Sequence, residues 1–318
     1  MKTRRLLFAT ATVGLTVSLT GQNHVAAYPY EVANVVPGND ADVLKIFPSD
    51  GSAITFALPF RFGHTMFGPD GKSLYVTSAP GHGGVRHEAP GLLKIEFNPI
   101  RANPVPGSQQ FLMKSFAISV HQDKLVISGS RRDGPSRTCG VFEVSMPAGS
   151  VKQVLAYDCS YMWAWDRLSL SSDGEMAIAS VGSNTTRDLH WELIDLVRGT
   201  TKPLAGDFRV GVWSPNGKWI ATLGNKDRNS LSLMDAQSLS RRRVFGNTAS
   251  IRPEWSPDSR YLLLWKYHPF RCGIGIDVEP PATLETLDIE SGKRSIVHSS
   301  QCQVLFGSTG WVNHDLAK

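Results

Sequence analysis

The chain has 318 residues and a formal net charge of +5, with 41% hydrophobic and 19% charged residues. These proportions are typical of a globular chain, and the spread of 29 glycines and 19 prolines indicates many turns joining many short strands. Lys2, Arg4 and Arg5 lie at the extreme N-terminus, so their removal would lower the charge from +5 to about +2. A charge this small argues against nucleic acid or an acidic membrane as the partner.

Residues 1–27 have the features of a secretory signal peptide. The three basic residues are followed by an apolar stretch at 6–19, and Val25-Ala26-Ala27 supplies small residues for cleavage. This stretch is too short for a spanning helix, and no later segment qualifies. We expect an exported chain, periplasmic or secreted, whose residues 28–318 form one domain without a membrane span. An uncleaved N-terminal anchor is the alternative.

Two strands are expected at residues 42–47 and 52–58, because Pro48-Ser-Asp-Gly51 between them is a strong turn signal. This pair reads as an outer hairpin with no inner strand before it.

A strand–turn–strand phrase then recurs along the chain, most clearly at residues 209–222 and 253–264. Its spacing of roughly 40 to 55 residues is the range for four-stranded propeller blades. The equivalent turn residues are Asp70, Asp123, Asp173, Asn216 and Asp258. The second copy, at 119–127, lacks the proline and glycine of the others.

A sixth inner strand is expected at residues 307–312, and only the N-terminal hairpin can complete its blade. The sequence therefore predicts an all-β, six-bladed propeller whose last blade is closed by the N- and C-terminal strands. A seven-bladed ring is the alternative.

The phrases WSPNGKWIA (213–221), EWSPDSRYLLL (254–264) and FGPDGKSLYV (67–76) resemble the WD40-like repeat of TolB-type propellers. The resemblance covers residues 66 to about 299 and implies an exported six-bladed protein. It specifies architecture and says little about activity. Other members are propeller domains attached to peptidases, but no Gly-x-Ser-x-Gly motif occurs in this sequence.

Large side chains recur at one position of the inner strands: Phe67, Leu170, Trp213, Trp255 and Trp311. We expect them to pack between neighbouring blades, because a large ring on an inner strand is usually core. They therefore indicate fold and not ligand.

The four cysteines predict two disulfides in an exported chain. In the repeat alignment, Cys139 and Cys159 flank the outer hairpin of the second blade, and Cys272 and Cys302 flank that of the fifth. The start of one antiparallel strand lies opposite the end of its partner, so we expect Cys139–Cys159 and Cys272–Cys302. A zinc site is the alternative, but the Cys-x-x-Cys spacing is absent.

In a propeller, the loops between the second and third strands and between the blades gather on one face. Arginine and histidine recur in these loops, and arginine can hold a carboxylate or phosphate with two hydrogen bonds. The candidate ligand-binding residues are His82, His87, Arg131, Arg132, Arg187, His190, His268 and Arg271. A solvated loop surface without a ligand is the alternative.

Three further basic residues fall at one position of alternate inner strands, three places before the recurring large residue. His64, Arg167 and Arg252 could form a ring at the channel mouth for a small anion or an acidic peptide end. The alternative is local pairing with nearby carboxylates such as Asp166 or Glu254.

The loop before the third inner strand is rich in aromatic residues. Tyr161, Trp163 and Trp165 would form a stacking platform for a sugar or a peptide anchor if they are exposed. If buried, they would seal the disulfide and the blade junction.

No metal site or cofactor is expected. The pair His82 and His87 lacks the helical spacing that presents two ligands on one face, and a catalytic metal needs about three converging ligands. The leading hypothesis is a non-catalytic, monomeric binding protein that takes a protein or peptide partner on the loop-rich face. The alternative is a secreted metal-dependent hydrolase or lyase acting on a small anionic or sugar substrate in the channel.

Overall fold

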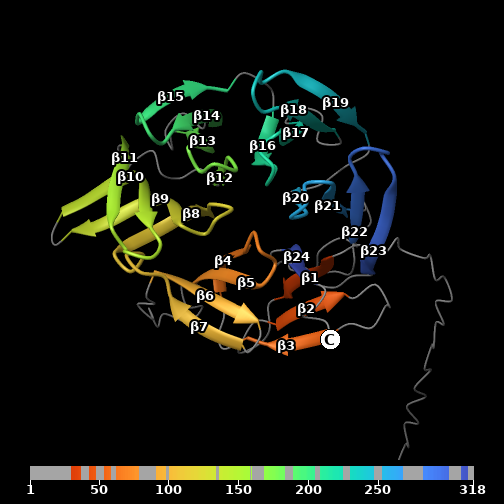
Figure 1. Cartoon of the computed structure of the whole chain (residues 1–318), viewed down its shortest axis with the longest axis horizontal. Helices are drawn as coiled ribbons and strands as arrows, with labels where there is room; N and C mark the ends of the chain where they lie inside the picture. Colours follow the sequence, from red (N-terminus) through yellow and green to blue (C-terminus); the bar gives the residue numbers. More distant parts are fainter. Residues whose placement is uncertain are drawn as a thin grey trace, which may run out of the picture.

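Strands and turns alternate along the chain, and the computed structural model arranges them as six four-stranded antiparallel blades around a central channel (Figure 1). The structure describes residues 30–36, 43–47, 54–58, 62–78, 91–97, 100–133, 136–157, 159, 168–182, 189–204, 208–224, 230–246, 253–267, 282–300 and 309–313. Within these ranges no helix has the length and apolar character needed to cross a membrane.

Each of the first three blades consists of four strands that are consecutive in the sequence. Blade 1 contains β4 (Phe62–Phe67), β5 (Ser73–Ser78), β6 (Leu92–Phe97) and β7 (Ile100–Pro104). Blade 2 contains β8 (Phe111–Ile118), β9 (Lys124–Asp133), β10 (Ser136–Ser145) and β11 (Val151–Tyr157). Blade 3 contains β12 (Leu168–Leu170), β13 (Met176–Gly182), β14 (Leu189–Asp195) and β15 (Thr200–Pro203).

The other three blades complete the ring. Blade 4 contains β16 (Phe208–Trp213), β17 (Trp219–Gly224), β18 (Leu231–Asp235) and β19 (Arg241–Phe245). Blade 5 contains β20 (Glu254–Trp255), β21 (Tyr261–Tyr267), β22 (Ala282–Asp288) and β23 (Arg294–Ser300). Blade 6 combines the two ends of the chain: β24 (Thr309–Asn313), β1 (Tyr30–Val36), β2 (Val43–Phe47) and β3 (Ile54–Ala57).

The ring closes where β24 pairs with β1, with Trp311 opposite Val32. Closure by the two chain ends confirms the six-bladed prediction, because the first and last strands of the chain share one blade. The expectation that no strand precedes the N-terminal hairpin was wrong, because β1 lies between β24 and β2. Local sequence gives little sign of β1, since Glu31 lies within it as a buried charged residue.

The turns that join the first and second strands of a blade share one backbone conformation. Gly71, Gly174 and Gly217 have φ angles of 65°, 69° and 72°, a region that glycine enters easily because it has no side chain. Gln122 and Ser259 occupy the same place with φ angles of 56° and 60°. The second repeat therefore keeps the common backbone although its glycine is missing.

The two non-glycine residues use their side chains to tie neighbouring blades together. The Oε1 atom of Gln122 accepts a hydrogen bond of 2.8 Å from the Tyr75 hydroxyl, and its Nε2 donates one of 2.8 Å to Asp70. The Ser259 hydroxyl accepts a bond of 2.9 Å from the backbone N–H of Asn216. In both cases the hydrogen bonds join the turn of one blade to the preceding blade in the sequence.

Serine side chains close several of these turns from within. The Ser214 hydroxyl donates to Asn216 Oδ1 at 2.8 Å and accepts from the backbone N–H of Trp219 at 2.9 Å. The Ser171 hydroxyl donates to Asp173 Oδ1 at 2.5 Å, and this bond holds the pKa of that carboxyl below its usual range.

Apolar side chains fill the space between adjacent blades. One cluster joins blade 6 to blade 1 and includes Leu44 and Leu74, and another joins blades 4 and 5. Because both faces of the middle strands are covered, β5 buries three consecutive hydrophobic residues, Leu74, Tyr75 and Val76, between the buried Ser73 and Thr77. Burial also raises the pKa of the Tyr75 hydroxyl above its ordinary value.

The alternating strand directions give the ring two different sides. The connections between first and second strands and between third and fourth strands lie on one side, which we call the turn face. The connections between second and third strands and between blades lie on the other side, which we call the loop face. Of the predicted ligand-binding residues, Arg131, Arg132 and His190 lie at the loop-face ends of described strands.

Candidate functional site

The inner strands of all six blades surround a cavity of about 150 Å³ in the central channel. Pro69, Pro215 and Pro257 line it, and all three belong to connections of the turn face. The cavity therefore lies at the turn end of the channel. This volume is enough to hold several water molecules or a small ligand group.

The wall of this cavity is mostly apolar. Among the described residues that line it, Glu254 is the one that carries an ionisable side chain. The indole N–H of Trp255 donates to the carbonyl of Val212 at 3.0 Å, and that of Trp311 donates to the carbonyl of Glu254 at 3.3 Å. The two tryptophans therefore link neighbouring inner strands through hydrogen bonds.

The prediction that the recurring large residues are core is confirmed. Trp213, Trp255 and Trp311 are 8%, 7% and 3% exposed, and Phe67 and Leu170 pack half-buried against core clusters. Their second role was not expected from the sequence, since all five also line the channel cavity.

The loop face carries one long hairpin among the described residues, formed by β9 and β10. Each of these strands has 10 residues, whereas β13 and β14 of blade 3 have 7 each. At about 3.3 Å per residue, three additional residues extend the blade 2 strands by about 10 Å. Arg131, Arg132 and Arg137 lie near the tip of this hairpin.

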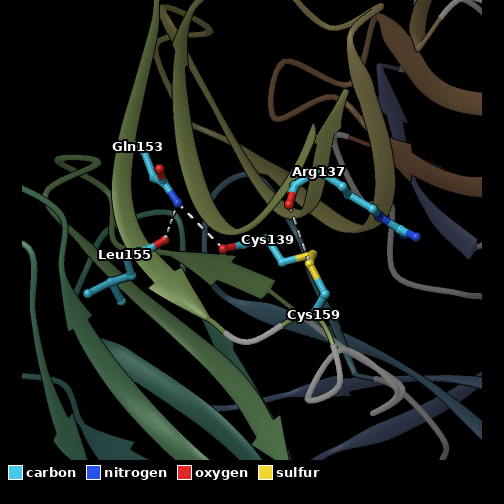
Figure 2. Close-up of a disulfide and its surroundings, with 5 residues drawn as sticks. All are labelled: Arg137, Cys139, Gln153, Leu155 and Cys159. Atoms are coloured by element: carbon cyan, nitrogen blue, oxygen red, sulfur yellow. Dashed lines mark hydrogen bonds between the residues drawn. A yellow bond between two sulfur atoms is a disulfide. The ribbon is translucent and has the colours of Figure 1, made fainter. Parts of the chain in front are cut away.

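A disulfide anchors this hairpin near its tip, as predicted. Cys139 lies on β10 and its sulfur bonds to Cys159, with 5.2 Å between the Cα atoms (Figure 2). The Cys159 sulfur also lies 3.9 Å from the carbonyl oxygen of Arg137. The bond links the hairpin covalently to the chain that follows β11. The predicted partner pair, Cys272 and Cys302, lies outside the described residues.

The arginines on the two faces of the hairpin differ in exposure and in hydrogen bonding. Arg131 is half-buried, and its Nε donates to Gln110 Oε1 at 2.9 Å. Arg132 and Arg137 are exposed and directly opposite each other in the β9–β10 register. The Arg137 side chain extends away from the disulfide (Figure 2).

The two other described candidates lie on separate strands. His64 is exposed on β4, and its backbone N–H donates to the Thr77 hydroxyl at 2.8 Å. His190 is exposed on β14, where its Nε2 lies 3.1 Å from Glu192 Oε1.

The remaining predicted site residues lie outside the described part of the chain, so their roles stay predictions. They are His82, His87, Tyr161, Trp163, Trp165, Arg167, Arg187, Arg252, His268 and Arg271. The basic ring of His64, Arg167 and Arg252 is therefore represented here by His64 alone. Within the described ranges, no group of three or more His, Cys, Asp or Glu side chains is arranged to hold a metal ion.

The roles of two residues at these sites were not expected from the sequence. Glu254 was named only as a carboxylate that could pair with the basic ring, and its place in the channel wall depends on the convergence of six strands. Arg137 belonged to a predicted ligand loop, but its pairing with Arg132 depends on the hairpin register. The sequence signal for Arg137 was the dense run Arg131-Arg-Asp-Gly-Pro-Ser-Arg137.

No protein-family model matches the sequence, and no curated protein matches it. Among solved structures, the fold is similar to TolB from Acinetobacter baumannii, with a TM-score of 0.60 and 13% identity over 92% of this chain and 68% of that one. It is also similar to a putative TolB from Agrobacterium tumefaciens, with a TM-score of 0.59 and 12% identity over 89% of this chain and 98% of that one.

A second kind of neighbour is an enzyme. An oligogalacturonate lyase from Vibrio parahaemolyticus has a TM-score of 0.52 and 9% identity over 80% of this chain and 71% of that one. At these identities each likeness establishes the fold alone. The chain is therefore a six-bladed β-propeller whose fold is similar to that of TolB.

Proposed function

We propose that this chain is an exported, non-catalytic propeller that binds a protein or peptide partner through its loop face. In this proposal, residues 1–27 direct export and are removed, and residues 28–318 form the mature monomer, which is periplasmic or secreted. The Cys139–Cys159 disulfide supports an oxidising compartment, because such bonds persist outside the reducing cytosol.

The observation that carries this proposal is the asymmetry between the two faces. On the turn face, short turns are closed by backbone and serine hydrogen bonds. On the loop face, the connections at residues 79–91, 158–167 and 268–281 are long. Long connections on a rigid scaffold commonly carry binding residues, and this face also presents exposed Arg132, Arg137 and His190.

The test compares two charge-reversal variants of the purified mature chain. The loop-face variant carries Arg132→Glu and His190→Glu, and the turn-face variant carries Lys72→Glu and Lys218→Glu at two exposed positions. Each chain is immobilised and exposed to an extract of the producing organism, and bound proteins are identified by mass spectrometry. We expect a partner that the wild type and the turn-face variant retain and that the loop-face variant loses. A partner lost only from the turn-face variant would contradict the proposal.

The competing function is that of a secreted metal-dependent hydrolase or lyase acting on a small anionic or sugar substrate in the channel. It is supported by the similar folds of oligogalacturonate lyases, one of them in complex with manganese at a TM-score of 0.51 and 11% identity. Metal analysis of the purified mature chain separates the two functions. Stoichiometric bound metal together with turnover of oligogalacturonate in added manganese would favour the enzyme.

A further inference from the structure

We propose that Arg132 and Arg137, at the tip of the β9–β10 hairpin, form a clamp for a carboxylate of an acidic segment in the partner. This inference rests on the proposed partner-binding function and names the chemistry of one contact in it. The two arginines are in an arrangement that is unfavourable in the free protein.

The two arginines are cross-strand neighbours on one face of the hairpin. Arg132 pairs with Arg137 in the register, two positions beyond the pair Ser130 and Cys139. The backbone N–H of Arg132 donates to the carbonyl of Gln110, 2.8 Å away on the other side of the strand. The Arg132–Arg137 pair is therefore a non-hydrogen-bonded pair, the kind in which opposite side chains approach most closely.

Like charges directly opposite each other destabilise a sheet. Both side chains are exposed, so water reduces this repulsion without removing it. An anion placed between the two guanidinium groups would reverse the sign of the interaction. The Cβ atoms of such a pair are about 5 Å apart, so both guanidinium groups can reach the same carboxylate.

The hairpin is built to hold this pair in place. Cys139 lies on the same face as Arg137, two residues further along β10, and its disulfide to Cys159 anchors the strand just below the pair. On the opposite face, Arg131 is held by Gln110 at 2.9 Å. The tip is therefore anchored on both faces, which lowers the entropy lost when a ligand binds.

Two other exposed arginines of the chain, Arg243 and Arg260, are used differently. Arg260 forms a salt bridge of 3.0 Å with Asp288, and Arg243 donates hydrogen bonds to the carbonyls of Ile289 and Glu290. These contacts have an evident structural role in joining strands or blades. The Arg132–Arg137 pair places two positive charges together on an exposed tip, where an acidic partner can approach.

The test uses a synthetic peptide with three consecutive glutamates flanked by glycines, and a control peptide with glutamines in their place. Binding to the purified mature chain is measured by calorimetry at low and high salt. We expect the glutamate peptide to bind and the glutamine peptide not to bind. Arg132→Gln and Arg137→Gln should each weaken binding about tenfold, the loss expected for one charge-assisted hydrogen-bonding group.

The matched control is Arg242→Gln, which removes the same charge from an exposed arginine on β19 of blade 4. It should change the affinity less than about twofold, because it leaves the hairpin intact. An equal loss in Arg242→Gln would overturn the clamp and show a general charge effect. Saturable binding of inorganic phosphate without binding of the glutamate peptide would also overturn it, since the ligand would then be a phosphoryl group.

Thermal unfolding without peptide supplies an independent reading. Arg137→Gln should keep or raise the melting temperature, because it removes the like-charge opposition. A clear drop would overturn the clamp by showing that the guanidinium group supports the fold. The glutamate peptide could fail to bind while a protein partner is still lost from the loop-face variant. That combination would overturn the clamp but would leave the proposed partner-binding function intact.

Discussion

The turn face and the loop face of this propeller are held together in different ways. On the turn face, the described connections are short and their polar groups bond to one another, as Ser214 does with Asn216 and Trp219. On the described part of the loop face, the blade 2 hairpin is held by a disulfide, and two arginines oppose each other at its tip. The contrast suggests that the turn face serves stability and that the loop face carries charge at a cost to stability.

The largest expected effect comes from breaking the closure of the ring. Trp311 is 3% exposed and lies on β24, the strand through which the C-terminal end joins blade 6. Trp311→Ala should lower the free energy of unfolding by about 3–5 kcal/mol, because it leaves a large cavity between blades. Urea unfolding measures the change, with Val244→Ala at a 54% exposed position as the control. Equal losses in both variants would contradict the role assigned to Trp311.

The next largest effect is expected from removing the Cys139–Cys159 disulfide of the loop face. Replacing both Cys139 and Cys159 by alanine opens a disulfide between residues 20 apart in sequence. A loop of this size predicts a loss of about 3 kcal/mol, because the unfolded chain gains conformational freedom. Urea unfolding of the double variant and the wild type under oxidising conditions checks this value. An unchanged transition would mean that the bond contributes nothing to the stability of the ring.

A smaller effect is expected at Gln122 on the turn face, where two substitutions separate the side-chain hydrogen bonds from the backbone strain. Gln122→Ala removes the hydrogen bonds to Tyr75 and Asp70 and keeps a side chain in the left-handed region, so it should cost about 1–2 kcal/mol. Gln122→Gly removes the same bonds but relieves about 1 kcal/mol of backbone strain, so it should cost less. If the glycine variant were the less stable of the two, the left-handed strain at this turn would be refuted.

The smallest effect is pH-dependent. The hydrogen bond from Ser171 lowers the pKa of Asp173 in the folded chain, so the carboxylate stabilises the fold above its unfolded pKa of about 4. This stabilisation is lost as the pH falls through the lower folded value. Asp173→Asn should therefore lose less stability between pH 5 and pH 3 than the wild type loses. Asn216 occupies the equivalent turn of blade 4, so the variant should keep its backbone. Identical pH slopes in urea unfolding would count against this account.

Much of the fold was predictable because its signals are local. The repeated turns depend on a few adjacent residues, such as the segment from Ser214 to Lys218, so their spacing counts the blades. The strand β1 was missed because its place depends on pairing with β24, nearly the whole chain away. Gln122 is a similar case: its φ angle is close to those of the turn glycines, but its residue type does not predict a positive φ.

The sequence predicted which kinds of residue form the candidate sites, but not how these residues are arranged in space. The Cys139–Cys159 pair followed from the expected strand register of blade 2, and the arginines of that blade were expected as ligand contacts. The opposition of Arg132 and Arg137 requires the exact pairing of β9 with β10, which residue types do not specify. The placement of Glu254 in the channel wall requires strands from all six blades.

The most direct test of the loop-face account is hydrogen–deuterium exchange of the mature chain with and without the triple-glutamate peptide. The account predicts slower exchange at residues 131–138, the tip of the β9–β10 hairpin, and unchanged exchange in the turn segments 68–72 and 214–218. Slower exchange confined to the turn segments, with the hairpin tip unchanged, would contradict it and would place the binding surface at the turn end of the channel.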